Sequence, residues 1–428
     1  MHRRDVASFA EGLRDEREVV CAEPNSLTAR RHLERLGVRF VASNQFLTSP
    51  ERFAGWAQQR RRLVMDDFYR EQRRVHGVLL DERGQPEGGR WSFDAENRRP
   101  PVRGLSAPAP WQPEEDAVDA QVRRDLDALP RLHLWGQDGP RSVAVTPEEA
   151  SRALRSFITT RLEVFGPWQD AMVNGEPVLF HSLLSAPMNL GVLEPLAAIR
   201  AAERAYRSGA VPIQSAERFV RQILGWREYM WGTYWLRCER WPQEDALSAS
   251  SDLPDAFWGR TTSWNCLDTV VAQVREMGYA HHIQRLMVLG NVMLLAGVKP
   301  WQAVRWFQGA FLDGAEWVMA PNAAGMALYA DGGQMATKPY AAGGNYINRM
   351  STYCRGCRYD PHARTGEDAC PVTALYWDFV DRHRERFAGH PRMRLPLRGL
   401  ARIDDRELEQ IRARAVRARR ELGLGQPG

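Results

Sequence analysis

Four of the six cysteines lie in a pattern that could bind a metal. Cys354 and Cys357 form a C-x-x-C pair, and Cys370 follows thirteen residues later, directly before Pro371. Cys266, 88 residues before the pair, is the candidate for a fourth ligand. Thiolates are soft ligands, so four of them suit either zinc or an iron–sulfur cluster. The spacing alone favours neither metal, and Cys266 taken by itself is more typical of a buried core thiol.

A pair of histidines could transfer protons. His281 and His282 are followed, one helical turn later, by Arg285. Adjacent residues of a helix point about 100° apart, so the two rings cannot both face one core, and one is expected to face a cleft. Histidine can donate a proton near neutral pH. A single histidine would more often be a core residue, whereas this pair indicates a possible site.

Polar residues and tryptophans are the other candidates for chemistry. Asp313, Glu316, Asn322 and the Asp331-Gly-Gly turn lie in an otherwise hydrophobic stretch. Because buried polar groups need partners, this stretch predicts either the polar edge of a cofactor site or a capped loop. The chain also has 15 tryptophans, for which core packing is the default role. Electron transfer or base stacking is the functional alternative.

The elements that must position these residues begin with a short α/β segment. Residues 18–24 and 38–42 are predicted to be short buried strands. The helix between them should begin after Ser26 and end at Gly37. Strand–helix–strand order is typical of a parallel sheet. Two strands are too few for a stable doubly wound domain, so either further strands come from later in the chain or the chain begins partway through such a domain.

The remaining chain is predicted to be helical after a connector. Residues 50–80 have helical periodicity, and residues 81–115 are rich in glycine and proline but contain aromatic residues typical of an ordered connector. From residue 147 onward, repeated capping residues and helical spacing of apolar residues predict helices with short breaks. The arginine-rich stretch 402–421 predicts a last helix with one solvated face.

Composition excludes some classes of protein and permits others. The 428 residues suggest two or three domains, and the formal net charge of +5 permits a nucleic-acid partner without requiring one. No run of about 18 apolar residues is present, and the charged N-terminal stretch lacks the apolar core of a signal peptide. We therefore expect a cytoplasmic protein with no membrane association, in which clustered cysteines bind metal rather than form disulfides.

Five segments of the chain resemble the iron–sulfur bacterial cryptochrome/photolyase family, whose characterised repair enzymes are prokaryotic (6-4) photolyases. The segments are GGRWSFDAENR (88–98), FHSLLSAPMNLG (180–191), RQILGWREYMWG (221–232), YAHHIQRLMVLGN (279–291) and DGAEWVMAPNAAGM (313–326). These motifs are long, and they run in order over nearly the whole chain. The four-cysteine spacing also matches that family, so the resemblance implies a 4Fe–4S cluster on Cys266, Cys354, Cys357 and Cys370.

The resemblance implies a fold class and domain boundaries. It implies a truncated α/β N-terminal Rossmann-like domain, then a large all-α photolyase-type FAD domain with a C-terminal iron–sulfur-binding helical region. The expected units are a partial α/β antenna-type domain (1–80), a connector (81–145), the catalytic FAD-binding domain (146–345) and a helical part that completes the iron–sulfur site with Cys266 (346–428). Family members bind an antenna pigment, ribityllumazine in several cases, beside a G-D-Q-L-like strand end. This sequence has no such motif, so binding of that antenna is not expected.

The resemblance also implies which residues form the site. Contacts to FAD are expected from Ser182, Leu183, Leu184, Ser185, Gln222, Trp226, Arg227, Arg285, Asp313 and Asn322. Within that set, the serine stretch would lie on the phosphate side, and Asp313 and Asn322 at the isoalloxazine edge. His282 would be the proton donor, with His281 as its neighbour. Residues expected to carry electrons or complete the pocket are Trp258, Trp306, Tyr340 and Tyr346.

The implied reaction is light-driven repair of (6-4) pyrimidine–pyrimidone photoproducts in UV-damaged DNA. Excited reduced FAD would give one electron to a lesion flipped into the pocket, and His282 would protonate it. We expect a monomer without an obligate protein partner. One alternative is a cryptochrome-like blue-light photoreceptor with the same FAD and cluster but little repair. Another is a nucleic-acid-binding iron–sulfur module such as the primase large subunit. The histidine pair favours repair, and the flavin motifs argue against the last alternative.

Overall fold

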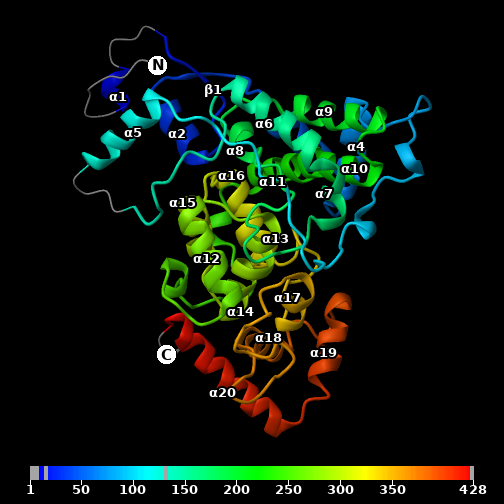
Figure 1. Cartoon of the computed structure of the whole chain (residues 1–428), viewed down its shortest axis with the longest axis vertical. Helices are drawn as coiled ribbons and strands as arrows, with labels where there is room; N and C mark the ends of the chain where they lie inside the picture. Colours follow the sequence, from blue (N-terminus) through cyan, green and yellow to red (C-terminus); the bar gives the residue numbers. More distant parts are fainter. Residues whose placement is uncertain (1–8, 14–17, 130–133, 425–428) are drawn as a thin grey trace.

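The computed structural model describes residues 9–13, 18–129 and 134–424. Residues 1–8 and 14–17 of the predicted N-terminal domain, 130–133 of the predicted connector and 425–428 of the predicted C-terminal part lie outside the described residues. Figure 1 shows helices of the first half of the chain at one end and the C-terminal helices α17–α20 at the other, with α12–α15 between them. A continuous core of buried apolar residues runs from Phe53 to Leu422.

The N-terminal α/β segment is a two-stranded parallel sheet. After α1 (Phe9–Gly12), strands β1 (Val20–Ala22) and β2 (Arg39–Val41) flank α2 (Leu27–Arg35). The predicted helix boundaries are confirmed, because the Ser26 hydroxyl accepts the Ala29 N–H and Gly37 has a φ of 74°.

The prediction that these strands are buried is wrong. Val20 in β1 is 45% exposed and Val41 in β2 is 40% exposed. The reason is that the sheet has only two strands among the described residues, so outward-pointing side chains have no neighbouring strand or layer to cover them. Whether the segment is the remainder of a larger doubly wound domain stays a prediction.

The predicted helical stretch 50–80 is two helices, α3 (Pro50–Gln58) and α4 (Met65–His76). The connector that follows is ordered, as predicted, with short 3₁₀ turns at Glu87–Gly89 and Asp94–Glu96 and with α5 (Ala117–Asp127). It is held to the helical body by backbone hydrogen bonds, such as Arg99 N–H to Pro167 O at 3.1 Å.

The helical body begins at α6, where the Thr146 side chain caps the N-terminus by accepting the Glu149 N–H. Its helices are α6 (Pro147–Thr160), α7 (Leu162–Trp168), α8 (Ser185–Asn189), α9 (Pro195–Arg207), α10 (Ile213–Val220), α11 (Glu228–Arg237), α12 (Asn265–Met277), α13 (His282–Gln284), α14 (Asn291–Ala296), α15 (Pro300–Ala310) and α16 (Glu316–Met319). Three π-helical segments continue these helices, at Arg221–Arg227, Arg285–Gly290 and Ala320–Ala327.

The C-terminal end contains α17 (Gly344–Met350), α18 (Pro371–Arg382), α19 (Arg394–Leu400) and α20 (Asp405–Leu422). Helix α20 matches the predicted last helix and packs along α18 (Figure 1). Two ion pairs join these helices, Arg419 to Asp378 and Arg412 to Asp381. No helix in the described part of the chain is both long and apolar enough to cross a membrane.

Candidate functional site

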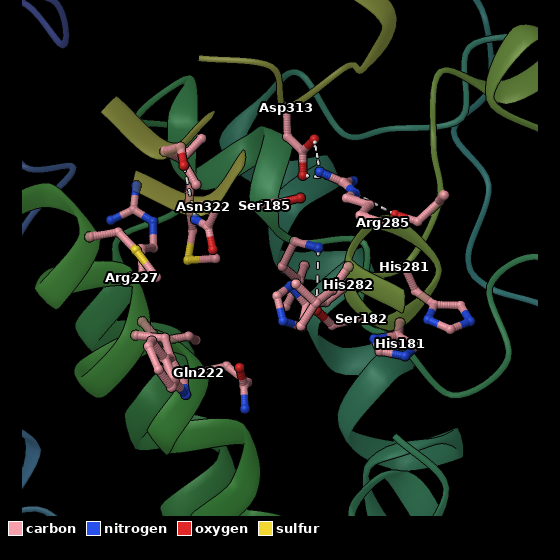
Figure 2. Close-up of a pocket in the computed structure, with 18 of the residues that line it drawn as sticks. His181, Ser182, Ser185, Gln222, Arg227, His281, His282, Arg285, Asp313 and Asn322 are labelled. Carbon is pink, nitrogen blue, oxygen red and sulfur yellow. Dashed lines mark hydrogen bonds and ion pairs between the residues drawn. The ribbon is translucent and has the colours of Figure 1, made fainter. Parts of the chain in front are cut away.

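A cavity of about 280 Å³ lies among the helices of the central body. This volume is near the lower end of the range for small-molecule sites. All ten residues predicted to contact FAD line it, and His281 and His282 line it as well. The remaining lining is mostly apolar, from residues such as Phe165, Met188, Phe219, Phe307 and Met326. Figure 2 shows the polar side chains facing one another across the cavity from separate helices and loops.

The three π-helical segments all contribute to this cavity. Arg221–Arg227 provides Gln222, Trp226 and Arg227, Arg285–Gly290 provides Arg285, and Ala320–Ala327 provides Asn322. A π-helical turn inserts an extra residue into a helix, which redirects side chains and is frequent at functional sites. The convergence of three such turns on one cavity marks it as the principal candidate site.

Gly290 allows two of these π-helical segments to approach closely. A Cβ atom at this position would lie 2.8 Å from the Ala327 Cβ atom and 3.0 Å from the Arg285 carbonyl oxygen. These separations are shorter than side chains tolerate, so glycine is needed where the segments containing Arg285 and Ala327 cross.

The loop from Ser182 to Ser185 enters the cavity in a strained conformation. Leu183 has a φ of 60°, which is unfavourable for a residue with a branched side chain. The Ser182 hydroxyl accepts the Leu184 N–H at 3.4 Å and stabilises this turn. Strain of this kind costs about 1–3 kcal/mol and is concentrated at ligand sites.

Arg285 and Asp313 form the strongest polar pair in the cavity. The guanidinium donates to both carboxylate oxygens, at 2.8 and 3.2 Å, and Arg285 Nε also donates to the Ala280 carbonyl at 2.6 Å. Paired hydrogen bonds between a guanidinium and a carboxylate fix the orientation of both groups. Arg285 and Asp313, both predicted FAD contacts, therefore fix one another's orientation in the cavity.

Arg227 is buried across the cavity from Arg285. Its guanidinium donates to the Gln45 carbonyl and, at 3.3 Å, to Asn189 Oδ1. Burial lowers the pKa of Arg227 to about 10, and the adjacent carboxylate of Glu228 opposes that shift. Arg227 thus remains a cation at neutral pH and supplies positive charge beside the cavity.

Two predicted amide contacts have different environments. Gln222 Nε2 is buried and has no hydrogen-bond partner among the described residues. Asn322 Nδ2, in contrast, donates to the Val318 carbonyl at 2.9 Å within its own helix. An unpartnered buried amide is costly unless a ligand accepts its hydrogen bond, so Gln222 is the better candidate for direct ligand contact.

His282 projects into the cavity, and His281 lies behind it (Figure 2). His282 is accessible from the cavity, whereas His281 is only 1% exposed. Desolvation by the surrounding protein, with positive charge from Arg285 and Arg218, lowers the pKa of His282 to about 4. Burial, with the neighbouring rings of His181 and His282, lowers the pKa of His281 well below its usual value. Both imidazoles are therefore neutral near pH 7 in the free protein.

His281 and His282 do not both lie on one helix, which corrects the expectation that helical geometry separates their rings. Only His282 belongs to a helix, as the first residue of α13. His281 precedes that helix with extended backbone angles, φ −73° and ψ 162°. The rings diverge because the chain changes conformation between them, and both of them line the cavity.

His181 is a cavity residue that the sequence interpretation missed. Its ring stacks on His281, with centroids 4.5 Å apart and planes 10° from parallel. His181 Nε2 lies 3.1 Å from the Gln169 carbonyl, and burial lowers the pKa of His181 to about 3. The available signal was its position directly before Ser182 in a segment already assigned to the site.

Trp258 and Trp306, predicted to carry electrons, lie outside the cavity lining. Trp306 is buried, and its indole N–H donates to the Phe257 carbonyl at 3.1 Å, whereas Trp258 is 51% exposed. Trp135, which the sequence interpretation missed, contacts both, with ring centroids 5.9 Å from Trp258 and 6.2 Å from Trp306. The arrangement joins a buried indole to a surface indole, and their electron-transfer roles stay predictions.

Tyr340 and Tyr346 also lie outside the cavity lining. They are half-buried near Asp170, and burial raises the pKa of Tyr346 to about 12. Neither tyrosine contacts the cavity directly, and their electron-transfer or pocket roles stay predictions.

The Asp331-Gly-Gly turn is a capped loop, because Asp331 accepts the backbone N–H groups of Gly333, Gln334 and Met335.

The four predicted cysteine ligands line one small cavity, here called the cysteine cage (Cys266, Cys354, Cys357 and Cys370). Cys266 lies in the first turn of α12, Cys370 directly precedes α18, and the other two lie in the loop between α17 and α18. Burial, with the nearby thiols, raises the pKa of Cys266 well above its usual value. No group of three or more His, Cys, Asp or Glu side chains in the described ranges meets the geometry of a single-ion site.

Gly344 lets α17 approach the cysteine cage. A Cβ atom there would lie 2.9 Å from Cys370 Sγ and 2.8 Å from Thr373 Oγ1. The other residues around the cage are mostly apolar or aromatic, namely Trp264, Ile347, Tyr353, Tyr359, Pro371 and Val372. Four thiols in such surroundings form a donor set for soft metals.

Known proteins are similar to this chain over most of its length. Residues 7–134 match the family described as deoxyribodipyrimidine photo-lyase-related protein. A (6-4) photolyase of Agrobacterium fabrum is 44% identical over 386 residues, which cover 89% of this chain and 75% of that protein. This chain belongs to the photolyase-related family. The family resemblance inferred from the five sequence segments is thereby confirmed.

A solved structure shows the photolyase fold. The crystal structure of a bacterial class III photolyase from Agrobacterium tumefaciens aligns with 97% of this photolyase-related chain and 82% of its own, with a TM-score of 0.51 and 17% sequence identity. At that identity the likeness concerns the fold alone. It agrees with the predicted helical photolyase-type body.

Proposed function

We propose that this protein is a (6-4) photolyase, which uses light to convert (6-4) photoproducts in UV-damaged DNA back to two pyrimidines. The observation that carries the proposal is the accessible ring of His282, which faces the same cavity as all ten predicted FAD contacts. The Agrobacterium fabrum relative, named a (6-4) photolyase, supports the same reaction.

The cavity residues fit FAD as the resident cofactor. Gln222 offers an unpartnered N–H, and Arg227 and Arg285 offer positive charge for an anionic cofactor. Ser182 and Ser185 add hydroxyl and backbone donors in the strained loop. When bound, FAD supplies the absorption of light and the one-electron chemistry. The protein residues bind and orient it, and the apolar lining limits access of water.

His282 is the proposed proton donor to the lesion. Because the pKa of His282 is lowered to about 4 in the free protein, proton donation near neutral pH requires a bound ligand that favours the charged ring. Desolvation is the larger cause of the low value, and the positive charges of Arg285 and Arg218 add to it. Arg285 lines the cavity and Arg218 does not, so an anionic ligand beside Arg285 would raise the pKa of His282. Extrusion of a damaged base costs a few kcal/mol, less than extrusion of a well-stacked base.

We also propose a 4Fe–4S cluster in the cysteine cage. A cluster needs space between its ligands because its iron and sulfide atoms lie there, and the four thiols of this chain face one cavity. The cluster would tie residue 266, at the start of α12, to the loop at residues 354–370, directly before α18. Its role in this proposal is to hold the C-terminal helices against the catalytic body.

A repair assay tests the proposed function. The protein, purified anaerobically, is illuminated with an oligonucleotide that carries one (6-4) photoproduct, and restored pyrimidines are measured. Light-dependent repair of this lesion is the expected result. Repair of cyclobutane dimers alone would assign the protein to another photolyase class. Flavin photochemistry with no repair of either lesion would favour the photoreceptor alternative.

A further inference from the structure

We infer that Gln284 and Tyr353 are positioning residues through which the cysteine cage sets the location of His281 and His282. The inference rests on the proposed function of the histidine pair, and it assigns the cage an effect on the reacting site. It follows from a buried hydrogen-bond network that joins the two sites and involves none of the predicted FAD contacts.

Gln284 is the centre of this network. It is 0% exposed, and its amide makes four hydrogen bonds. Its Nε2 donates to Tyr353 OH at 2.8 Å and to Gln273 Oε1 at 2.9 Å. Its Oε1 accepts the His281 backbone N–H at 3.0 Å and Gln273 Nε2 at 3.1 Å. A buried amide with both donors and both acceptor positions used has one favoured orientation.

One connection from the cage runs along α12. Cys266 and Gln273 are seven residues apart on this helix, which is about two turns, so they lie on one side of it. Gln273 bonds to Gln284 in both directions, and its Nε2 also donates to the Tyr279 carbonyl at 3.1 Å. A displacement of Cys266 along α12 is therefore transmitted to Gln284 and to the chain just before the histidine pair.

A second connection runs through Tyr353, the residue next to Cys354. Tyr353 is 1% exposed and lines the cage cavity. Its carbonyl accepts Asn265 Nδ2 at 2.7 Å, and Asn265 is the residue next to Cys266. Its hydroxyl accepts the hydrogen bond from Gln284. The segment that contains Cys266 is thus hydrogen-bonded to the segment that contains Cys354, and the latter is hydrogen-bonded to Gln284.

The network ends at the turn that directs the histidine rings. The bond from His281 N–H to Gln284 Oε1 closes the first turn of α13, which begins at His282. On its other side, the His281 ring stacks on His181. His281 is therefore fixed on one side by the Gln284 side chain, which is bonded to Tyr353, and on the other by the ring of His181. A shift of about 1 Å at a reacting group can cost roughly 100-fold in rate.

Three holoenzyme variants test the inference. Tyr353→Phe removes the hydroxyl acceptor and keeps the ring against the cage. Gln284→Leu removes all four side-chain hydrogen bonds at similar volume. Tyr359→Phe is the matched control, because Tyr359 lines the same cage cavity but makes no bond to Gln284 or Gln273 in the described structure. Iron content and absorbance near 400 nm, measured for all three, establish that the cage is loaded.

Two readouts separate positioning from general stability. We expect kcat for repair to fall ~10-fold in Tyr353→Phe and ~100-fold in Gln284→Leu, with KM for lesion DNA nearly unchanged. We expect ¹⁵N-histidine NMR signals of His281 and His282 to shift in both variants, while Tyr359→Phe matches the wild type. The inference is overturned if Tyr353→Phe with a loaded cage keeps the wild-type kcat and histidine signals. It is overturned equally if Tyr359→Phe changes them as much. A wild-type protein without repair activity would refute the proposed function, and the histidine signals would still test the connection.

Discussion

The cavity at His282 and the cysteine cage are joined by α12 and α13, and different kinds of residue form their walls. The cavity takes residues from the 165–327 region and contains buried charges such as Arg227 and the Arg285–Asp313 pair. The cage takes its ligands from three short segments, and its other walls are almost entirely apolar or aromatic. The comparison indicates that the cavity depends on electrostatic balance, whereas the cage, under the proposed function, depends on a bound cluster that satisfies four thiols.

The largest expected effect comes from removal of one cage ligand. Cys266→Ser replaces a soft ligand with a hydroxyl at the only ligand on α12. We expect loss of iron and of the broad absorbance near 400 nm, and release of the C-terminal helices to proteolysis. Metal analysis and limited proteolysis measure these results. Cys238→Ser, outside the cage, should leave both unchanged, and a Cys266→Ser protein with full iron content would exclude Cys266 as a ligand.

The next effect distinguishes a reacting histidine from a core histidine. His282→Ala should lower the repair rate ~10²–10⁴-fold at a saturating light dose, because it removes the proposed general acid. FAD content should remain near that of the wild type. His383→Ala is the control, since burial also lowers the pKa of His383 to about 4 but His383 lies outside the cavity lining. Equal loss in the two variants would show that stability, not proton transfer, is responsible.

A smaller effect is expected at the paired carboxylate of the cavity. Asp313→Asn removes the charge that orients Arg285 through bonds of 2.8 and 3.2 Å. A charge-assisted hydrogen bond contributes about 1.5–3 kcal/mol, so FAD affinity should fall roughly 10–100-fold. Fluorescence titration of the apoprotein with FAD measures this change. Asp252→Asn breaks the exposed ion pair with Lys299 and should have no detectable effect, so a similar loss there would contradict a local role for Asp313.

The sequence predicts the cage better than the cavity because the cage signal is local. The C-x-x-C pair and Cys370 occur within seventeen residues, and Gly344 and Tyr353 lie near them in the chain. The proposed fourth ligand, Cys266, needed the family resemblance because nothing in its neighbours marks it as a ligand. The structure supports its assignment only by bringing it to the same cavity as the other three.

The cavity depends on features that residue spacing does not encode. The resemblance identified ten lining residues but missed His181, and Tyr340 and Tyr346, expected to carry electrons or complete the pocket, lie outside the lining. Two of the π-helical turns that converge there come into close contact where Gly290 meets Ala327, residues far apart in the sequence, so local spacing does not reveal this contact. The α2 boundaries were predictable because capping is local, whereas the exposure of β1 and β2 depends on which other strands are present.

The smallest expected effect is on the pH dependence of the protein's stability, and it comes from Glu228, the neighbour of the cavity residue Arg227. Glu228 is 0% exposed, accepts the Leu47 and Thr48 N–H groups at 2.9 Å, and lies 3.7 Å from Arg227. Burial raises the pKa of Glu228 to about 7, and Arg227 only partly opposes this shift. The folded protein therefore binds this proton more tightly than the unfolded chain, in which the pKa is about 4.3.

A pKa raised in the folded state gives a defined sign. The stabilisation from the protonated carboxyl is fully present below about pH 4.3 and is lost as pH rises through about 7. Glu228→Gln keeps an acceptor for the two N–H groups but does not titrate. The melting temperature of Glu228→Gln minus that of the wild type should therefore rise by a few °C between pH 5 and pH 8. Glu18→Gln, at an exposed ion pair with Arg39, is the control and should give a flat difference. A flat difference for Glu228→Gln would mean that Arg227 keeps this carboxylate charged, and that the charges at the cavity wall balance without a proton.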